Sequence, residues 1–253
     1  MPAPGILLDL ALTLHPEHAT AQQRHAAVLA SRLGYREVWL PVGGERGFPE
    51  YARLDALGGA ARPARLGLIV QGGAGEAVAG LLRLTPGAGD QVLLELPAAT
   101  AGLLRAVGGV AAWRERARLP TFDATAAGTV ITRATREEAI TAVAAAAAAR
   151  TRAGLAPDQH VVVASLPVSI GRTLNEAVAR ALRDPRFAGG EHPRERGIFG
   201  TYEHAQNQVL ELAAAGADVL RVTVADEIDV ADLLAQVRSL VVGATPVLHA
   251  RRS

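Results

Sequence analysis

Two histidines follow the first apolar segment of the chain, and they are the first residues that suggest chemistry. His15 and His18 flank Pro16 and Glu17. An imidazole exchanges protons near neutral pH, so His15 is a candidate proton donor or substrate-orienting group. A solvated loop histidine with no catalytic role is the alternative.

Glu95 is the second candidate, because it is the one charged residue in the apolar segment 92–96. A buried carboxyl group has a raised pKa and needs a partner, and arginine is the natural one. We therefore treat Glu95 as a candidate catalytic residue. The alternative is that Glu95 lies at the end of a strand and faces solvent without a functional role.

A glycine pair follows the apolar segment 66–70, in the sequence Gln71-Gly72-Gly73. Two residues without side chains let the backbone approach a flat ring closely. An ordinary turn between a strand and a helix is the equally reasonable alternative, because glycine pairs are common at such turns.

A metal site is the weaker possibility. His15, His18, Glu95 and His249 carry suitable ligand atoms, but they lack compact spacing such as His-x-x-x-His on a helix. We predict no metal, and a metal-dependent barrel isomerase or hydrolase is a third hypothesis for the function.

Composition excludes several classes of enzyme. The 253 residues contain no cysteine, and all 26 basic residues are arginine, because lysine is absent. Disulfides, thiolate catalysis, Schiff-base chemistry and P-loop lysines are therefore excluded.

The net charge of +1 gives no electrostatic case for nucleic acid. We find no leader or bilayer-spanning apolar run and expect a cytoplasmic protein that does not bind membranes.

Apolar, β-branched segments alternate with helical ones from end to end. Strands are predicted at 6–12, 37–40, 66–70, 92–96, 128–131, 160–166 and 219–224. Capping boxes at 20–23, 135–138 and 173–176 predict three of the helices. Thr201 is predicted to cap another helix, which ends at Gly216.

This alternation and the length predict one (β/α)8 TIM barrel over residues 1–253, with an open doubly wound sheet as the alternative. Seven strands can be assigned, and segment 98–122 shows helical patches but no clear strand. We therefore expect a barrel that is shortened or irregular around its fourth and fifth β/α units. The active site of such a barrel lies at the carboxyl ends of its strands.

Three segments resemble the bacterial luciferase-like superfamily of flavin- and deazaflavin-dependent barrels. They are residues 5–41, which contain Gly-Tyr-Arg-Glu-Val-Trp-Leu at 34–40, residues 65–71, and residues 154–242, which contain Gly-Ile-Phe-Gly-Thr at 197–201. Together they cover well over half of the chain, and their order and spacing are more specific than any one of them.

The resemblance implies an oxidoreductase, either a flavin-dependent monooxygenase or a deazaflavin-dependent reductase or dehydrogenase, that acts on a small organic substrate. Its cofactor is FMN or the deazaflavin coenzyme F420. Together with the strand-end rule, the resemblance implies cofactor contacts from Thr13, Val70, Gln71, Gly72, Gly73, Gly200 and Thr201, and substrate contacts from Trp39, Pro41 and Ser169. A homodimer or a paired subunit is expected.

One departure from the family matters. Members usually carry a long insertion after the fourth strand and then a fifth strand of the type Pro-Pro-Ile-x-Val-Gly-Gly, whose end and neighbouring basic residues hold the flavin phosphate. The interval 96–129 contains no match to this strand and is too short for the usual fourth helix, insertion and fifth unit together. Arg105, Arg114, Arg116 and Arg118 in this region offer phosphate contacts, although their spacing favours the solvated face of a helix. A barrel that has lost its cofactor and acts as a binding or partner subunit is therefore the alternative function.

Overall fold

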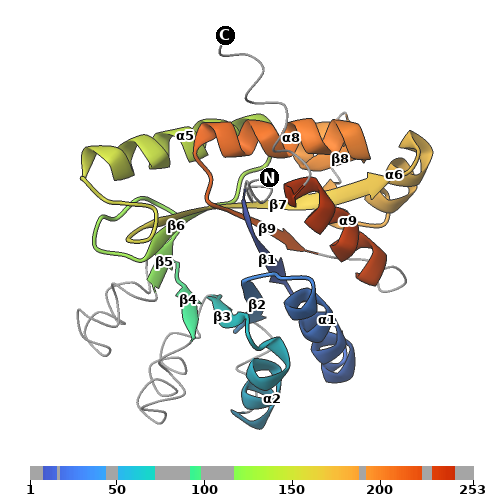
Figure 1. The fold of residues 1–253 in the computed structure, drawn as a ribbon, viewed down its shortest axis with the longest axis horizontal. Coiled ribbons are helices and arrows are strands. Elements are labelled where there is room, and N and C mark those ends of the chain that lie inside the picture. The colour runs from blue at the N-terminus through green and yellow to red at the C-terminus, as the bar shows by residue number, and fades with distance from the viewer. Residues whose placement is uncertain are drawn as a thin grey trace, which may run out of the picture.

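The computed structural model describes residues 8–15, 18–43, 51–71, 92–97, 117–187, 192–223 and 230–242. Eight strands in these residues form a closed parallel barrel (Figure 1). They are β1 (Asp9–Thr13), β2 (Glu37–Val42), β3 (Arg65–Val70), β4 (Leu93–Glu95), β5 (Ala117–Leu119), β6 (Gly128–Ile131), β7 (Val161–Gly171) and β9 (Val219–Thr223). The order is β6-β5-β4-β3-β2-β1-β9-β7, and pairing of β6 with β7 closes the ring. This closure confirms the barrel and excludes the open sheet.

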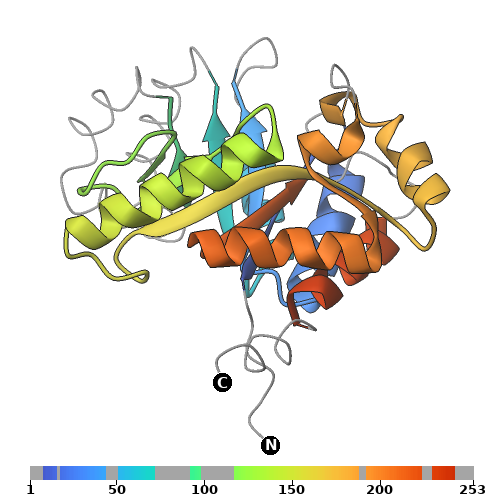
Figure 2. The same ribbon diagram turned by 90° about the horizontal axis from the view of Figure 1, so that it is seen from above.

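Helices cover the outside of the barrel. They are α1 (Thr20–Arg32), α2 (Tyr51–Ala61), α5 (Arg136–Arg152), α6 (Leu174–Ala181), α7 (Pro193–Arg196), α8 (Tyr202–Ala215) and α9 (Val230–Val242), with the 3-10 helix η3 (Pro185–Phe187). Helices α5 and α8 pack together over β7, and α9 packs against both α1 and α8 (Figures 1 and 2). The main apolar core lies between these helices and the outer faces of the strands. No helix of the described ranges is both long and apolar enough to cross a bilayer.

The predicted irregularity lies in the middle of the barrel, and the interval 96–129 contains a short fifth strand that the sequence did not reveal. β5 lies in that interval, and residues 120–127 join it to β6 by turns without a helix. A three-residue strand and a helix-free connection fit into a length that ordinary β/α units would exceed. The region could not be read from the sequence because β5 is only three residues long and holds Arg118.

Local signals place most helix ends. Thr135 and Glu138 exchange both capping hydrogen bonds, at 3.2 Å each, and Thr173 accepts from the Glu176 backbone N–H at 3.3 Å. The capping box predicted at 20–23 lies one residue earlier in the structure, because the N-cap of α1 is Ala19 and not Thr20. The Ala19 N–H donates to the Gln22 side chain at 2.8 Å. Gly216 ends α8 in the left-handed region, with φ of 101°.

A ninth strand, β8 (Ile198–Thr201), was not predicted. It pairs with the outer half of β7, where Ile170 lies opposite Gly200, and it takes no part in the ring. The Gln208 side chain bonds both backbone groups of Phe199, accepting from its N–H at 2.9 Å and donating to its carbonyl at 3.0 Å. This amide imitates a neighbouring peptide and so covers part of the edge of β8.

Candidate functional site

The inner face of the barrel holds a small apolar cluster around Trp39. Its buried members are Ala11, Trp39, Leu93, Val130, Val163 and Val219. Trp39 lies against Gly67 on the adjacent strand, and a Cβ atom built on Gly67 would lie 2.4 Å from the indole. Only glycine leaves room for the indole at this position.

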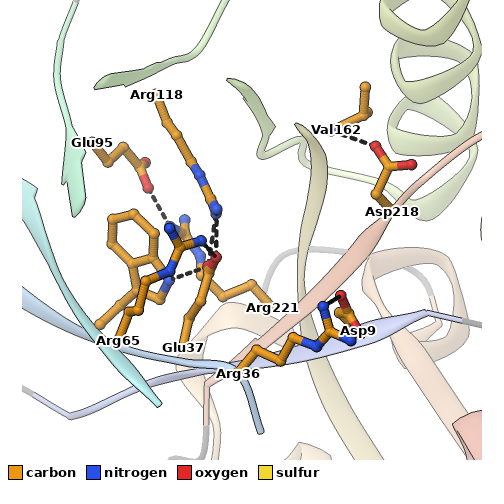
Figure 3. A network of polar contacts seen from close by, with 10 residues as sticks. Asp9, Arg36, Glu37, Arg65, Glu95, Arg118, Val162, Asp218 and Arg221 are labelled. Carbon is orange, nitrogen blue, oxygen red and sulfur yellow. Dashed lines mark hydrogen bonds and ion pairs between the residues drawn. The ribbon is translucent and has the colours of Figure 1, made fainter. Parts of the chain in front are cut away.

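A buried ion pair lies beside Trp39. Glu37, at the start of β2, accepts two hydrogen bonds from Arg118 of β5, and the Trp39 indole N–H donates to the same carboxylate at 3.0 Å. The side chains of Arg118 and Glu37 are 1% and 4% exposed, and the half-exposed Arg65 adds a third donor at 3.2 Å (Figure 3). Burial raises the pKa of Glu37, but the Arg118 charge and these hydrogen bonds outweigh it and leave the pKa below its usual value of 4.5.

A second ion pair crosses the barrel towards the carboxyl ends of the strands. Arg221 of β9 pairs with Glu95, the last residue of β4 (Figure 3). Arg221 also donates from Nε to Ser165 Oγ at 3.1 Å. The guanidinium carbons of Arg221 and Arg118 lie 5.4 and 5.1 Å from the Trp39 ring centroid. Trp39 therefore contacts both cations, and Glu95 extends this network to the carboxyl ends of the barrel strands, a region that we call the mouth.

A pocket lies where β1 ends. It is lined by Leu12, Thr13, Leu14, His15, His18, Gln23, Ala26 and Val230. The rings of His15 and His18 have centroids 4.7 Å apart, and Gln23, fully buried on α1, donates to the His15 carbonyl at 2.8 Å. The Thr13 hydroxyl is buried and has no hydrogen-bond partner among the described residues. An unpartnered buried hydroxyl in a pocket is a group that a ligand can satisfy.

The structure brings some of the predicted site residues together and separates others. Thr13 and His15 share the pocket, whereas Trp39 and Glu95 both contact Arg221. Pro41 and Gln71 lie at the mouth ends of β2 and β3, but the Val70 side chain packs in the outer core. Gly72 and Gly73 lie outside the described residues.

The remaining predicted residues lie on the β7–β8 pair. Ser169 is buried and donates to the Ala177 carbonyl at 2.7 Å. Gly200 has φ of 125°, and Thr201 occupies the N-cap of α8 but does not cap it as predicted. Its hydroxyl lies 2.8 Å from His204 Nδ1 and makes no hydrogen bond to a helix N–H.

Sequence reasoning missed most of the charged network. It placed Arg118 on a solvated helix, which is wrong, because Arg118 is a buried residue of β5. Glu37 and Arg221 were not considered, although each is a charged residue in an otherwise apolar strand, as Glu95 is. The suggested pairing of Glu95 with an arginine is confirmed. Among the described residues, no three His, Asp or Glu side chains lie close enough to hold a metal ion.

Solved structures of flavin and deazaflavin enzymes share this architecture. A coenzyme F420-dependent tetrahydromethanopterin reductase from Methanopyrus kandleri aligns with a TM-score of 0.71 and 13% identity, over 94% of this chain and 99% of that chain. An F420-dependent secondary alcohol dehydrogenase, in complex with an F420-acetone adduct, aligns with a TM-score of 0.64 and 11% identity, over 94% of this chain and 99% of that chain. The FMN complex of the oxygenating constituent of 3,6-diketocamphane monooxygenase from Pseudomonas putida aligns with a TM-score of 0.63 and 11% identity, over 95% of this chain and 98% of that chain.

The chain has the luciferase-like barrel fold. No protein-family model and no curated protein matches its sequence. At these identities the luciferase-like likeness establishes the fold alone, so the function has to be argued from the residues at the mouth.

Proposed function

We propose that the chain is an oxidoreductase that binds FMN or coenzyme F420 at the mouth of its barrel and acts on a small organic substrate. The observation that carries this proposal is the buried Thr13 hydroxyl, which has no hydrogen-bond partner among the described residues and belongs to a residue that lines the pocket at the end of β1, in a barrel of luciferase-like fold. The mouth is where barrels of this architecture place their active sites.

The described residues fit the ring of such a cofactor better than its phosphate. Thr13 offers a hydroxyl to a polar ring edge, His15 lies in the same pocket, and Gln71 lies at the end of β3. The cofactor would supply the hydride or oxygen chemistry, while these residues would bind and orient it. His15 would hold or donate a proton at an imidazole nitrogen.

The test is a titration of the purified chain with FMN and with F420, followed by fluorescence quenching, together with an absorbance spectrum. Thr13→Val should weaken binding about 2–12-fold, the value of one ordinary hydrogen bond. The free variant should remain as stable as the parent, because the hydroxyl has no hydrogen-bond partner to lose in the part of the chain that the structure describes. Thr151→Val, on the exposed face of α5, is the matched control. Absence of saturable binding of either cofactor contradicts the proposal.

The alternative is a partner subunit that binds no cofactor, and one observation favours it. Two arginines near this side of the barrel are already engaged. Arg221, in the middle of β9, pairs with Glu95, and Arg186 of η3 pairs with Asp184 and donates to the Thr223 carbonyl at 2.8 Å. A cofactor phosphate would need a cation from elsewhere. Under either function we propose a homodimer or a paired subunit, to be tested by light scattering. Turnover of reduced flavin by the isolated chain contradicts the partner-subunit alternative.

A further inference from the structure

We infer that Glu95 is a specificity-determining residue, which neutralises Arg221 and so excludes anionic ligand groups from the floor of the mouth. The inference rests on the proposed function in one respect only, namely that the mouth binds a ligand. It assigns the Glu95–Arg221 pair a role in ligand choice rather than in the reaction itself.

Each of the two ion pairs inside the barrel balances its own charges. Glu37 balances Arg118, and Glu95 balances Arg221. The Arg221 side chain is 4% exposed, so its charge is poorly hydrated and depends on the carboxylate. An unpaired buried guanidinium would attract an anion strongly, because little water competes for it.

In the Glu95–Arg221 pair, the carboxylate lies closer to the mouth than the guanidinium. Glu95 is the last residue of β4 and is 18% exposed, so it is the more accessible member of the pair. Arg221 is also held by a hydrogen bond to Ser165 and by contact with Trp39. A ligand that enters through the mouth therefore meets the carboxylate before the cation. A carboxylate or phosphate group would be repelled there, whereas a neutral group would not.

Chemical rescue tests this arrangement without a cofactor. Glu95→Ala should leave Arg221 unpaired beside a space shaped like a small carboxylate. Acetate should then bind and raise the melting temperature of E95A by about 3–6 °C at ten times its Kd, as linkage predicts for a domain of this size. Acetamide, its neutral analogue, should have no such effect at the same concentration and ionic strength. The parent chain should not respond to acetate.

Two controls separate this site from general salt effects. Glu211→Ala removes the carboxylate of the more exposed pair with Arg136, and it should give no saturable response. E95A combined with Arg221→Met should lose the response to acetate. If E95A does not fold in buffer, refolding with acetate but not with acetamide supports the inference, and failure with both overturns it.

Saturable stabilisation of the parent chain by acetate would also overturn the inference, as would equal responses of E95A and E211A. Because the probe contains no flavin, failure to bind FMN or F420 would contradict the proposed function alone. Cofactor binding without rescue of E95A would contradict the inference alone.

Discussion

Removing the Arg118 guanidinium should destabilise the barrel more than any exposed ion pair can. In Arg118→Met the Glu37 carboxylate remains buried, and its remaining donors among the described residues are the Trp39 N–H and the half-exposed Arg65. Loss of one member of a buried pair costs about 3–5 kcal/mol, and these two donors place the expected loss near the lower value, about 3 kcal/mol. For a chain of this size that loss corresponds to about 6–12 °C in melting temperature.

The assay is urea unfolding followed by circular dichroism, with Arg36→Met as the matched control. Arg36 pairs with Asp9 at 3.0 Å, but its side chain is 68% exposed, so its removal should cost no more than about 1 kcal/mol. Glu37→Gln combined with R118M removes both charges and keeps an acceptor for Trp39. This double variant should lose much less than the two single variants together.

The pH dependence provides a second measurement of the same pair. The folded pKa of Glu37 lies below its unfolded value, so its contribution to stability is complete above about pH 4.5 and is lost as the pH falls further. R118M should remove this acid-side contribution. A loss below about 1 kcal/mol in R118M, or losses that add in the double variant, would show that the pair is not the buried, coupled unit described above.

Three further changes have defined outcomes. Burial lowers the pKa of His160, whose ring bonds Thr129 and the Ala126 carbonyl, so stability should fall as the pH drops below 6.5, and His160→Gln should flatten melting temperature against pH in that window. Gln208→Ala should cost about 1 kcal/mol in urea unfolding and promote self-association in light scattering, because it uncovers the edge of β8. Gly67→Ala should cost about 1–3 kcal/mol and shift Trp39 emission, measured in a Trp113→Phe background, since the added methyl meets the indole. An unchanged emission spectrum would mean that the indole does not rest on Gly67.

The sequence predicted those parts of the fold that local chemistry determines. Capping residues placed α5 and α6, and Gly216 marked the turn between α8 and β9, because such preferences act over a few residues. β5 could not be predicted in this way. It is three residues long, holds a charged side chain, and is a strand only because β4 and β6 pair with it.

The candidate site shows the same limit. Single residues at strand ends, such as Thr13 and Glu95, can be found from their position in an apolar pattern. The partners Glu37 and Arg118 are far apart in the sequence, and only closure of the barrel brings them into contact. Screening every predicted strand for a single charged residue would have found Glu37 and Arg221, but not which partner each one has.

The length of β7 limits how the mouth can respond to a ligand. Its inner half pairs with β6 and β9 in the ring, and its outer half continues as the partner of β8. Lengthwise sliding of β7 would break its pairs with β6 and β9 in the ring and its pairs with β8 at the same time. The register of β7 is therefore fixed along both halves of the strand. A ligand at the mouth cannot shift this strand along its axis without breaking pairs on every neighbouring strand.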